Sequence, residues 1–172
     1  MLNGLAPLVS STTRLLVLGS FPGVASLAAQ QYYGHPRNAF WKILQAIWPS
    51  CALPMGDDSY KIRSDWLLGK GLGLWDVYAA CEREGSLDSQ IRQPVLNDFA
   101  NLKRTCPALQ AIAHNGGESF RHARHVSDAL ASVGVAFHKL PSTSPAHASW
   151  SFDRKLAAWR EVFEHYELID KP

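Results

Sequence analysis

Four short apolar runs, each followed by a polar cluster, limit the possible folds of this chain more than any other feature. The runs cover residues 15–18, 71–78, 108–113 and 133–140. Each run has a length typical of a buried strand. Helical spacing of apolar residues predicts helices over 40–48, 59–68, 99–103, 118–130 and 149–166. Strands that alternate with helices predict an α/β fold with a mostly parallel sheet covered by helices on both faces.

The segments between these elements are predicted to be loops. Residues 1–13 show little pattern, and residues 19–23 (GSFPG) form a turn in which glycine lowers the cost of a positive φ. A second loop with the sequence YYGHPRN leads into the helix at residue 40. Residues 80–94 are polar and are also predicted to be a loop. The aromatic residues of 39–48 and 150–163 are assigned to the core.

The composition predicts one domain, residues 1–172. A chain that is 47% hydrophobic at this length can bury a sizeable core. The net charge of +2 neither establishes nor excludes binding to nucleic acid. The isolated cysteines, Cys51, Cys81 and Cys106, argue against a disulfide framework, a zinc site and a four-cysteine iron–sulfur cluster. No apolar stretch is long enough to span a membrane, so we expect a soluble, cytoplasmic protein.

Polar residues at the strand ends predict where a site forms. The carboxyl ends of parallel strands lie at one edge of a sheet, and ligand sites of α/β proteins form there. Four clusters are therefore expected to converge: residues 19–23, Asp76, residues 114–116 and residues 141–147. They contain serines, asparagines, aromatics and histidines, but no cysteine nucleophile and no paired carboxylates. Such groups suit a planar heterocycle, which stacks on aromatics and is hydrogen-bonded along its edge.

Nucleotide-binding and serine-hydrolase functions have less support in the sequence. A P-loop and a G-x-G-x-x-G dinucleotide motif are absent, and so is the G-x-S-x-G nucleophile elbow. Ser20, His35 and Asp76 can be combined into a hydrolase triad on paper, although a turn residue is the more ordinary role for Ser20. Asp76 is expected to be a cap or loop anchor. His35 and His114 are expected to be structural hydrogen-bonding groups.

The order of the motifs resembles the uracil-DNA glycosylase superfamily, and most of all its hypoxanthine-DNA (deoxyinosine) glycosylase branch. The motifs are GSFPG, QYYGHPRNAFW, GLWDVY, the NG pair at 115–116 and LPSTSPA. The resemblance implies a three-layer α/β/α fold around a central four-stranded, mostly parallel sheet. It implies hydrolysis of the N-glycosidic bond of a deaminated base in DNA, with hypoxanthine as the main base and uracil as a related one. An abasic site would remain, and no metal or cofactor is implied.

The resemblance also implies roles for individual residues. Asn38, in the H-P-x-N segment, corresponds to the catalytic asparagine that positions the attacking water. Mismatch-type uracil glycosylases carry this asparagine in the first loop, G-I-N-P-G, where this chain has Phe21. Tyr33 corresponds to the aromatic that stacks on the flipped base, and Asn115 to an asparagine of the active site. Backbone N–H groups near Ser20 and Phe21 are expected to contact the edge of the base.

The loop after the fourth strand corresponds to one that presses into the minor groove and holds the base out. Its expected DNA-binding residues are Pro141, Ser142, Thr143, Ser144, Pro145 and His147. His147 stands where the family has an asparagine. Arg37, Arg121 and Arg124 are candidate phosphate contacts. DNA with a deaminated base is thus the expected partner, bound by a monomer that acts at the nucleoid of a bacterial-type cytoplasm.

Three alternatives stay open at this level. An asparagine just before a helical stripe is also a helix N-cap, so Asn38 can be a cap, a catalyst or both. Phe21 in the place of an asparagine leaves a catalytically silent nucleic-acid-binding domain of the same fold as an alternative function. An esterase or nucleoside hydrolase using Ser20 is a third. The sequence does not rank hypoxanthine, uracil and xanthine as substrates.

Overall fold

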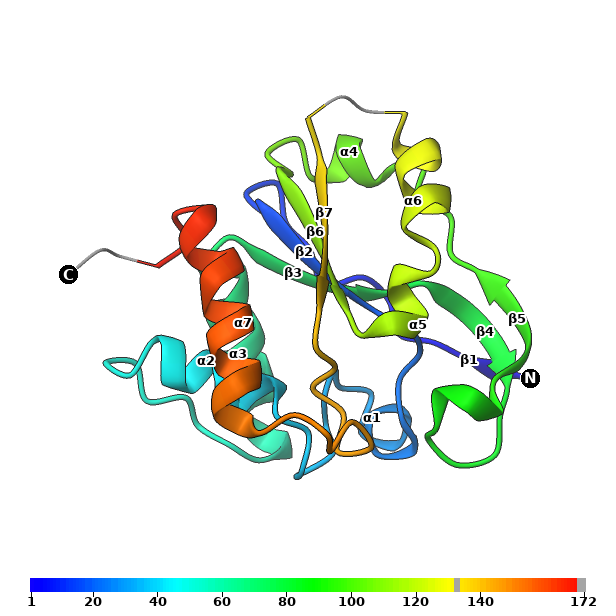
Figure 1. Cartoon of the computed structure of the whole chain (residues 1–172), viewed down its shortest axis with the longest axis horizontal. Helices are drawn as coiled ribbons and strands as arrows, with labels where there is room; N and C mark the ends of the chain where they lie inside the picture. Colours follow the sequence, from blue (N-terminus) through cyan, green and yellow to red (C-terminus); the bar gives the residue numbers. More distant parts are fainter. Residues whose placement is uncertain (132–133, 170–172) are drawn as a thin grey trace.

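A parallel sheet of four strands lies at the centre of the computed structural model, which describes residues 1–131 and 134–169 (Figure 1). In chain order the strands are β2 (Leu15–Gly19), β3 (Leu72–Asp76), β6 (Ala111–Asn115) and β7 (Ala136–Leu140). In space they follow the order β3-β2-β6-β7, and every pair is parallel. The four apolar runs therefore supply the four strands. Val133, in the predicted last run, lies outside the described residues.

Helices cover both faces of this sheet (Figure 1). One layer contains α2 (Phe40–Ile47), α3 (Tyr60–Gly69) and α7 (Phe152–His165), and the other contains α4 (Leu102–Thr105), α5 (Gly117–Phe120) and α6 (Ala123–Leu130). Leu15 and Val17 of β2 pack in an apolar cluster with the first layer, whereas Leu16 and Leu18 pack in a cluster with the second. Side chains of a strand alternate between its two faces, so an unbroken apolar run belongs to a strand covered on both sides. The predicted three-layer α/β/α fold is confirmed.

Residues 80–94 do not form the predicted loop. β4 (Tyr78–Glu82) pairs antiparallel with β5 (Arg92–Leu96) on one side and with β1 (Leu2–Asn3) on the other. A 3₁₀ turn, η2 (Asp88–Gln90), lies between β4 and β5. Most of β5 is exposed, so the strand carries no apolar pattern that sequence reasoning could detect. The predicted strand 71–78 accordingly divides at Val77 into β3 and β4.

The helices also differ from the prediction in places. α1 (Val24–Ala29) was not predicted at all, and a 3₁₀ turn, η1 (Asp57–Ser59), precedes α3. The helix predicted over 118–130 is divided into α5 and α6. The Ser119 hydroxyl donates a hydrogen bond to the Leu18 carbonyl oxygen at 2.7 Å. This bond holds α5 against β2 before α6 begins.

The last helix starts three residues later than predicted, at Phe152. Trp150, which was assigned to the core, precedes the helix and belongs to neither apolar cluster. The Arg154 guanidinium lies 3.6 Å from the centroid of its ring. Trp159 and Phe163 do pack in the core. A guanidinium on its face lets Trp150 stay half-buried at the surface.

The N-terminus of α7 has a side-chain cap. Ser151 is extended, and its Oγ accepts a hydrogen bond from the Arg154 backbone N–H at 3.2 Å. Ser151→Ala removes this acceptor and is expected to lower the free energy of unfolding by about 1 kcal/mol. Urea unfolding of both proteins measures the difference. Ser151→Asp keeps an acceptor and should retain the stability of the wild type; a loss equal to that of the alanine variant would show that the bond contributes nothing.

Candidate active site

A cavity of about 650 Å³ lies at the carboxyl edge of the parallel sheet. In Figure 1 the segment after β2, helix α1 and the loop after β7 meet at this edge. All four predicted polar clusters contribute to the cavity wall. The predicted site residues that line it are Ser20, Phe21, Tyr33, Asn38, Asn115, Ser142, Thr143, Ser144, Pro145 and His147. Pro141 does not line it; its carbonyl oxygen accepts a hydrogen bond from the Trp159 indole N–H at 3.0 Å.

Asn38 is half-buried in the wall, immediately before α2. Its Oδ1 accepts a hydrogen bond from the Phe40 backbone N–H at 3.0 Å, and the neighbouring Ala39 N–H is donated to the Thr143 carbonyl oxygen at 2.9 Å. Asn38 therefore caps the first turn of the helix from the position before Ala39, the N-cap residue, which makes no side-chain cap hydrogen bond. A carbonyl oxygen accepts two hydrogen bonds, so Oδ1 keeps one acceptor site for a water molecule. The cap is thus compatible with the predicted catalytic role, which stays a prediction.

Asn115, the last residue of β6, connects two walls of the cavity. Its Nδ2 donates to the Tyr33 hydroxyl oxygen at 3.2 Å and to Thr143 Oγ1 at 2.9 Å. Its Oδ1 accepts the Thr143 backbone N–H at 3.0 Å. Both amide hydrogens are therefore used inside the protein. The predicted contact of Asn115 with the base stays a prediction, and this geometry favours an anchoring role.

Tyr33 forms an aromatic part of the cavity wall. It adopts the left-handed conformation with a φ of 56°, and its ring centroid lies 4.2 Å from that of Phe40. Burial, with the charge of Asp76 nearby, raises the pKa of the Tyr33 hydroxyl above its ordinary range. The hydroxyl therefore stays protonated at neutral pH. Phe40 packs against the ring of Tyr33, and Asn115 donates a hydrogen bond to its hydroxyl. A neutral ring fixed in this way suits the predicted stacking on a base, which stays a prediction.

The loop of residues 141–147 is held in place from within and from β6. Ser142 Oγ accepts the Ser144 N–H at 3.2 Å, and the Ser144 carbonyl oxygen accepts the His147 N–H at 3.0 Å. Gly116 has a φ of 98°, and a Cβ added to it would lie 3.1 Å from Ser142 Cβ. Only glycine fits this approach without strain. The loop is therefore fixed before any ligand arrives, which lowers the entropic cost of binding.

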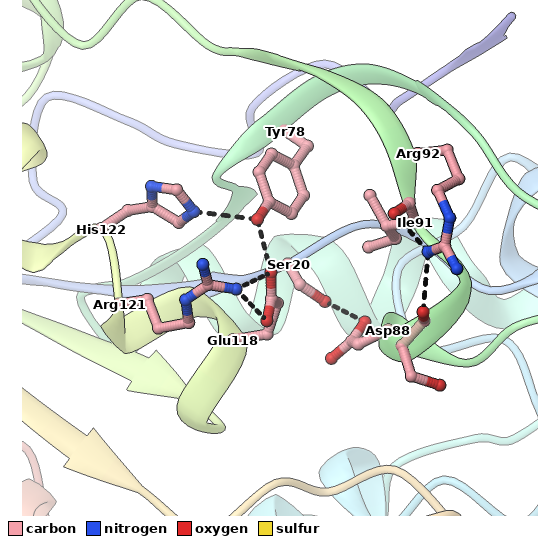
Figure 2. A network of polar contacts seen from close by, with 9 residues as sticks. Ser20, Tyr78, Asp88, Ile91, Arg92, Glu118, Arg121 and His122 are labelled. Carbon is pink, nitrogen blue, oxygen red and sulfur yellow. Dashed lines mark hydrogen bonds and ion pairs between the residues drawn. The ribbon is translucent and has the colours of Figure 1, made fainter.

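Ser20 does not take part in a hydrolase triad. Its hydroxyl donates to Asp88 Oδ1 at 2.7 Å (Figure 2). His35 Nδ1 instead accepts the Arg37 backbone N–H at 3.0 Å. The arrangement of Ser20 with His35 and Asp76 that the sequence allowed is thus not formed. Asp88, the partner of Ser20, lies in η2, within residues 80–94, which were predicted to be a loop.

The side chain of Phe21 is buried in the core rather than directed at a ligand. The Arg83 guanidinium lies 5.2 Å from its ring centroid and donates to the Pro22 carbonyl oxygen at 2.6 Å. These contacts fix the GSFPG turn against β4. The predicted contribution of Phe21 through its main chain is compatible with this placement and stays a prediction.

A separate polar cluster consists of Tyr78, Glu118, Arg121 and His122 (Figure 2). The Tyr78 hydroxyl donates to Glu118 Oε1 at 2.6 Å and lies 2.8 Å from His122 Nε2. Arg121 donates two hydrogen bonds to the Glu118 carboxylate, at 3.0 and 3.1 Å. Its guanidinium is therefore already paired. Of the predicted phosphate contacts, Arg37 on the cavity wall is better placed than Arg121.

Asp76 is the residue of the site that sequence reasoning undervalued. It ends β3, lines the cavity and is only 5% exposed. Burial, together with the negative charge of Asp88, raises the pKa of Asp76 to about 7, against the opposing effect of Arg83. The detectable signal was a carboxylate at the end of an apolar run. Its raised pKa could not be predicted, because burial depends on the tertiary structure and because Asp88 and Arg83, whose charges act on Asp76, lie in the unpredicted β4–β5 segment.

His114 takes the structural role predicted for it. It is fully buried, and its Nδ1 lies 2.7 Å from Ser119 Oγ. Burial lowers the pKa of His114 to about 4, so the ring is neutral at physiological pH. The hydrogen bond to Ser119 adds to the link between β6 and α5.

Residues 1–131 and 134–169 contain no group of three or more His, Cys, Asp or Glu side chains placed to hold a metal ion. Cys51, Cys81 and Cys106 are free thiols within this part of the chain. That the protein needs no metal or cofactor stays a prediction. The same residues contain no helix long and apolar enough to cross a membrane.

A family model described as the uracil DNA glycosylase superfamily matches residues 6–165, nearly the whole chain. The chain belongs to this superfamily. Its membership confirms the resemblance seen in the order of the motifs. In this chain, residues from the family's motif segments line one cavity.

Similar proteins of the superfamily occur in the genus Methanosarcina. A protein from Methanosarcina acetivorans named hypoxanthine DNA glycosylase is 37% identical over 164 residues, which are 95% of this chain and 98% of the relative. One of the same name from Methanosarcina barkeri is 34% identical, over 94% of this chain and 98% of the relative. A solution NMR structure from Methanosarcina acetivorans, described as a candidate uracil DNA glycosylase, superposes with a TM-score of 0.80 at 34% identity, covering 96% of this chain and 98% of that chain.

Proposed function

We propose that this chain is a monofunctional DNA glycosylase that hydrolyses the N-glycosidic bond of deaminated bases and leaves an abasic site. Hypoxanthine, the base of deoxyinosine, is the principal substrate, and uracil is a secondary one. The observation that carries the proposal is the single cavity shared by Asn38, Tyr33 and the loop 141–147. Superfamily membership and two relatives named hypoxanthine DNA glycosylase support it.

The cavity is suited to a base taken out of the DNA helix. Its volume of about 650 Å³ lies within the range of small-molecule pockets. A base inside the duplex is out of reach, so the nucleotide must rotate into the cavity at a cost of a few kcal/mol. The ring of Tyr33 offers a stacking surface, which compensates part of this cost. A mispaired base costs less to extract, which adds to selectivity.

The chemistry requires positioning rather than a strong base. The C1′–N bond breaks toward an oxocarbenium-like sugar while water approaches C1′. An amide is a poor base, so Asn38 acts by orienting the water through the free acceptor site of Oδ1. Backbone N–H groups of Ser20 and Phe21 stabilise the charge that develops on the departing base.

The DNA backbone is held by the rim of the cavity. Backbone N–H groups and hydroxyls of the loop 141–147 contact phosphates and press into the minor groove. Arg37 lies on the cavity wall, and so does His147, the last residue of this loop. The protein acts as a monomer and as one domain over residues 1–172. We place it in the cytoplasm at the nucleoid.

The test is base release from labelled duplexes that contain one deoxyinosine, one deoxyuridine or one deoxyxanthosine, with an undamaged duplex as the control. We expect release of hypoxanthine to be fastest and the undamaged strand to stay intact. Binding of the duplexes without release of any base would contradict the proposal. That outcome would support the catalytically silent DNA-binding domain, which Phe21 in the place of a catalytic asparagine leaves as the alternative.

A further inference from the structure

The carboxyl group of Asp76 is buried at the cavity without a partner of its own. Oδ2 is inaccessible to solvent and forms no hydrogen bond with any described residue. A Cβ added to Gly19 would lie 2.5 Å from Oδ1, so the carboxyl group packs directly against β2. Buried polar atoms are almost always hydrogen-bonded, and an exception requires an explanation. A ligand in the cavity that Asp76 lines is one explanation.

The charged and titratable groups around Asp76 favour its neutral form. Tyr32 and Tyr33 face it from the segment before α2, and Asp88 faces it from η2. Arg83, the residue after β4, is the one cation among the described groups that act on it, and its effect is smaller than those of burial and Asp88. The carboxyl therefore changes charge near pH 7. DNA phosphates at the rim would add negative potential and favour the neutral form further.

We propose that the protonated carboxyl group of Asp76 hydrogen-bonds the lactam edge of the flipped base, and that its ionisation slows base release. This inference rests on the proposed glycosylase function. A protonated carboxyl carries a donor and an acceptor side by side. Hypoxanthine presents O6 as an acceptor beside N1–H as a donor, so the two groups pair through two hydrogen bonds once the carboxyl turns to bring Oδ2, which solvent does not reach here, toward the cavity. Uracil presents the same pattern at O4 and N3–H.

The pairing also explains why charge matters for the reaction. The oxygen of water bonds to C1′ as the C1′–N bond breaks, and the electron pair of that bond leaves with the base. A proton from the water balances the charge, and the proton of Asp76 stays on its carboxyl. The donor of Asp76 stabilises the departing, negatively charged base. An ionised carboxylate would present only acceptors and would repel both O6 and the developing charge.

The pH dependence of single-turnover hypoxanthine release separates the two forms. For the wild type we expect the rate to fall about tenfold per pH unit above a midpoint at or above about pH 7. Asp76→Asn keeps a donor and an acceptor in the same shape but does not titrate. Its rate should stay within about tenfold of the wild type at pH 6 and lack this fall. Asp76→Leu, which has neither group, should lose about 10- to 100-fold at pH 6.

Two controls keep the result interpretable. Binding to a duplex with a stable abasic analogue, which has no base edge, should be similar for all three proteins. Urea unfolding tests the protonation state without any substrate. Asp76 ordinarily ionises near pH 3.8 and does so near pH 7 in the folded protein, so the folded state binds the extra proton between these values. The stability of the wild type relative to Asp76→Asn should therefore fall as pH rises through this window and then level off.

Several results would overturn the inference. An equal fall of the Asp76→Asn rate with pH would assign the titration to another group. An Asp76→Asn rate as low as that of Asp76→Leu at pH 6 would show that the donor and acceptor pair is not what the base contacts. If the wild type releases no base from any duplex, the proposed function fails and takes this inference with it. If the wild type is active but Asp76→Asn gives either of the first two results, the role of Asp76 is overturned and the proposed glycosylase function stands.

Discussion

Asn38→Ala is expected to lower the single-turnover rate of hypoxanthine release by about a hundredfold or more. The variant lacks the carbonyl oxygen that orients the attacking water, whereas the cavity and the loop 141–147 remain. It also loses the hydrogen bond that the Phe40 N–H donates to Asn38 Oδ1, at a cost of about 1 kcal/mol in unfolding free energy. Base release from a deoxyinosine duplex under enzyme excess, together with urea unfolding, measures both effects.

Asn38→Ser separates the cap from the catalyst. Serine is as good an N-cap as asparagine, so the unfolding free energy should stay close to that of the wild type. The shorter hydroxyl does not extend as far into the cavity, so the rate should remain as low as in the alanine variant. Wild-type release by Asn38→Ser would mean that Asn38 acts only as a cap. The water would then have to be held by another group on the wall.

Asn115→Leu is expected to have the largest effect on the folded protein. The substitution leaves the Thr143 N–H, Thr143 Oγ1 and the Tyr33 hydroxyl without their partner. Loss of these hydrogen bonds, with one donor and two acceptors left in a partly buried setting, should lower the unfolding free energy by about 2–4 kcal/mol. Tyr33 and the loop 141–147 also lose their common anchor. Hypoxanthine release should therefore fall by about tenfold or more.

The matched control is Ser144→Ala on the same loop. Ser144 Oγ accepts only an exposed hydrogen bond, from the Ala146 N–H at 3.2 Å. Its loss should change stability by less than about 0.5 kcal/mol. If Asn115→Leu kept full stability but released hypoxanthine slowly, Asn115 would act on the base directly rather than as an anchor.

The candidate site could be predicted in part because strand ends in a parallel sheet share an edge. Asn115 and residues 142–147 line one cavity, as the order of the strands predicted, and Asn38 and Tyr33, which the resemblance assigned to the site, line it too. The sequence could not predict which partners these side chains choose. Both hydrogens of the Asn115 amide are used by Tyr33 and Thr143, residues 82 and 28 positions away.

The three-stranded sheet β1-β4-β5 could not be predicted from the sequence, for a different reason. β5 is mostly exposed and contains a proline, so neither apolar alternation nor strand propensity marks it in the sequence. The β4–β5 segment nevertheless supplies Asp88, which accepts the Ser20 hydroxyl hydrogen bond and disfavours ionisation of Asp76. A segment that looked like an unremarkable loop thus helps to determine the charge of the site.

The four parallel strands, the helices on both faces of the sheet and the family could be predicted from the amino-acid sequence, because apolar runs and the order of motifs can be recognised along the chain alone. The state of individual groups required the folded structure. Asn38 is a cap with one acceptor site free, Ser20 is paired with Asp88, and Asp76 is a buried carboxyl with a pKa of about 7. Burial and hydrogen-bond partners depend on residues brought together from distant parts of the chain. They set the chemistry of a side chain as strongly as its identity does.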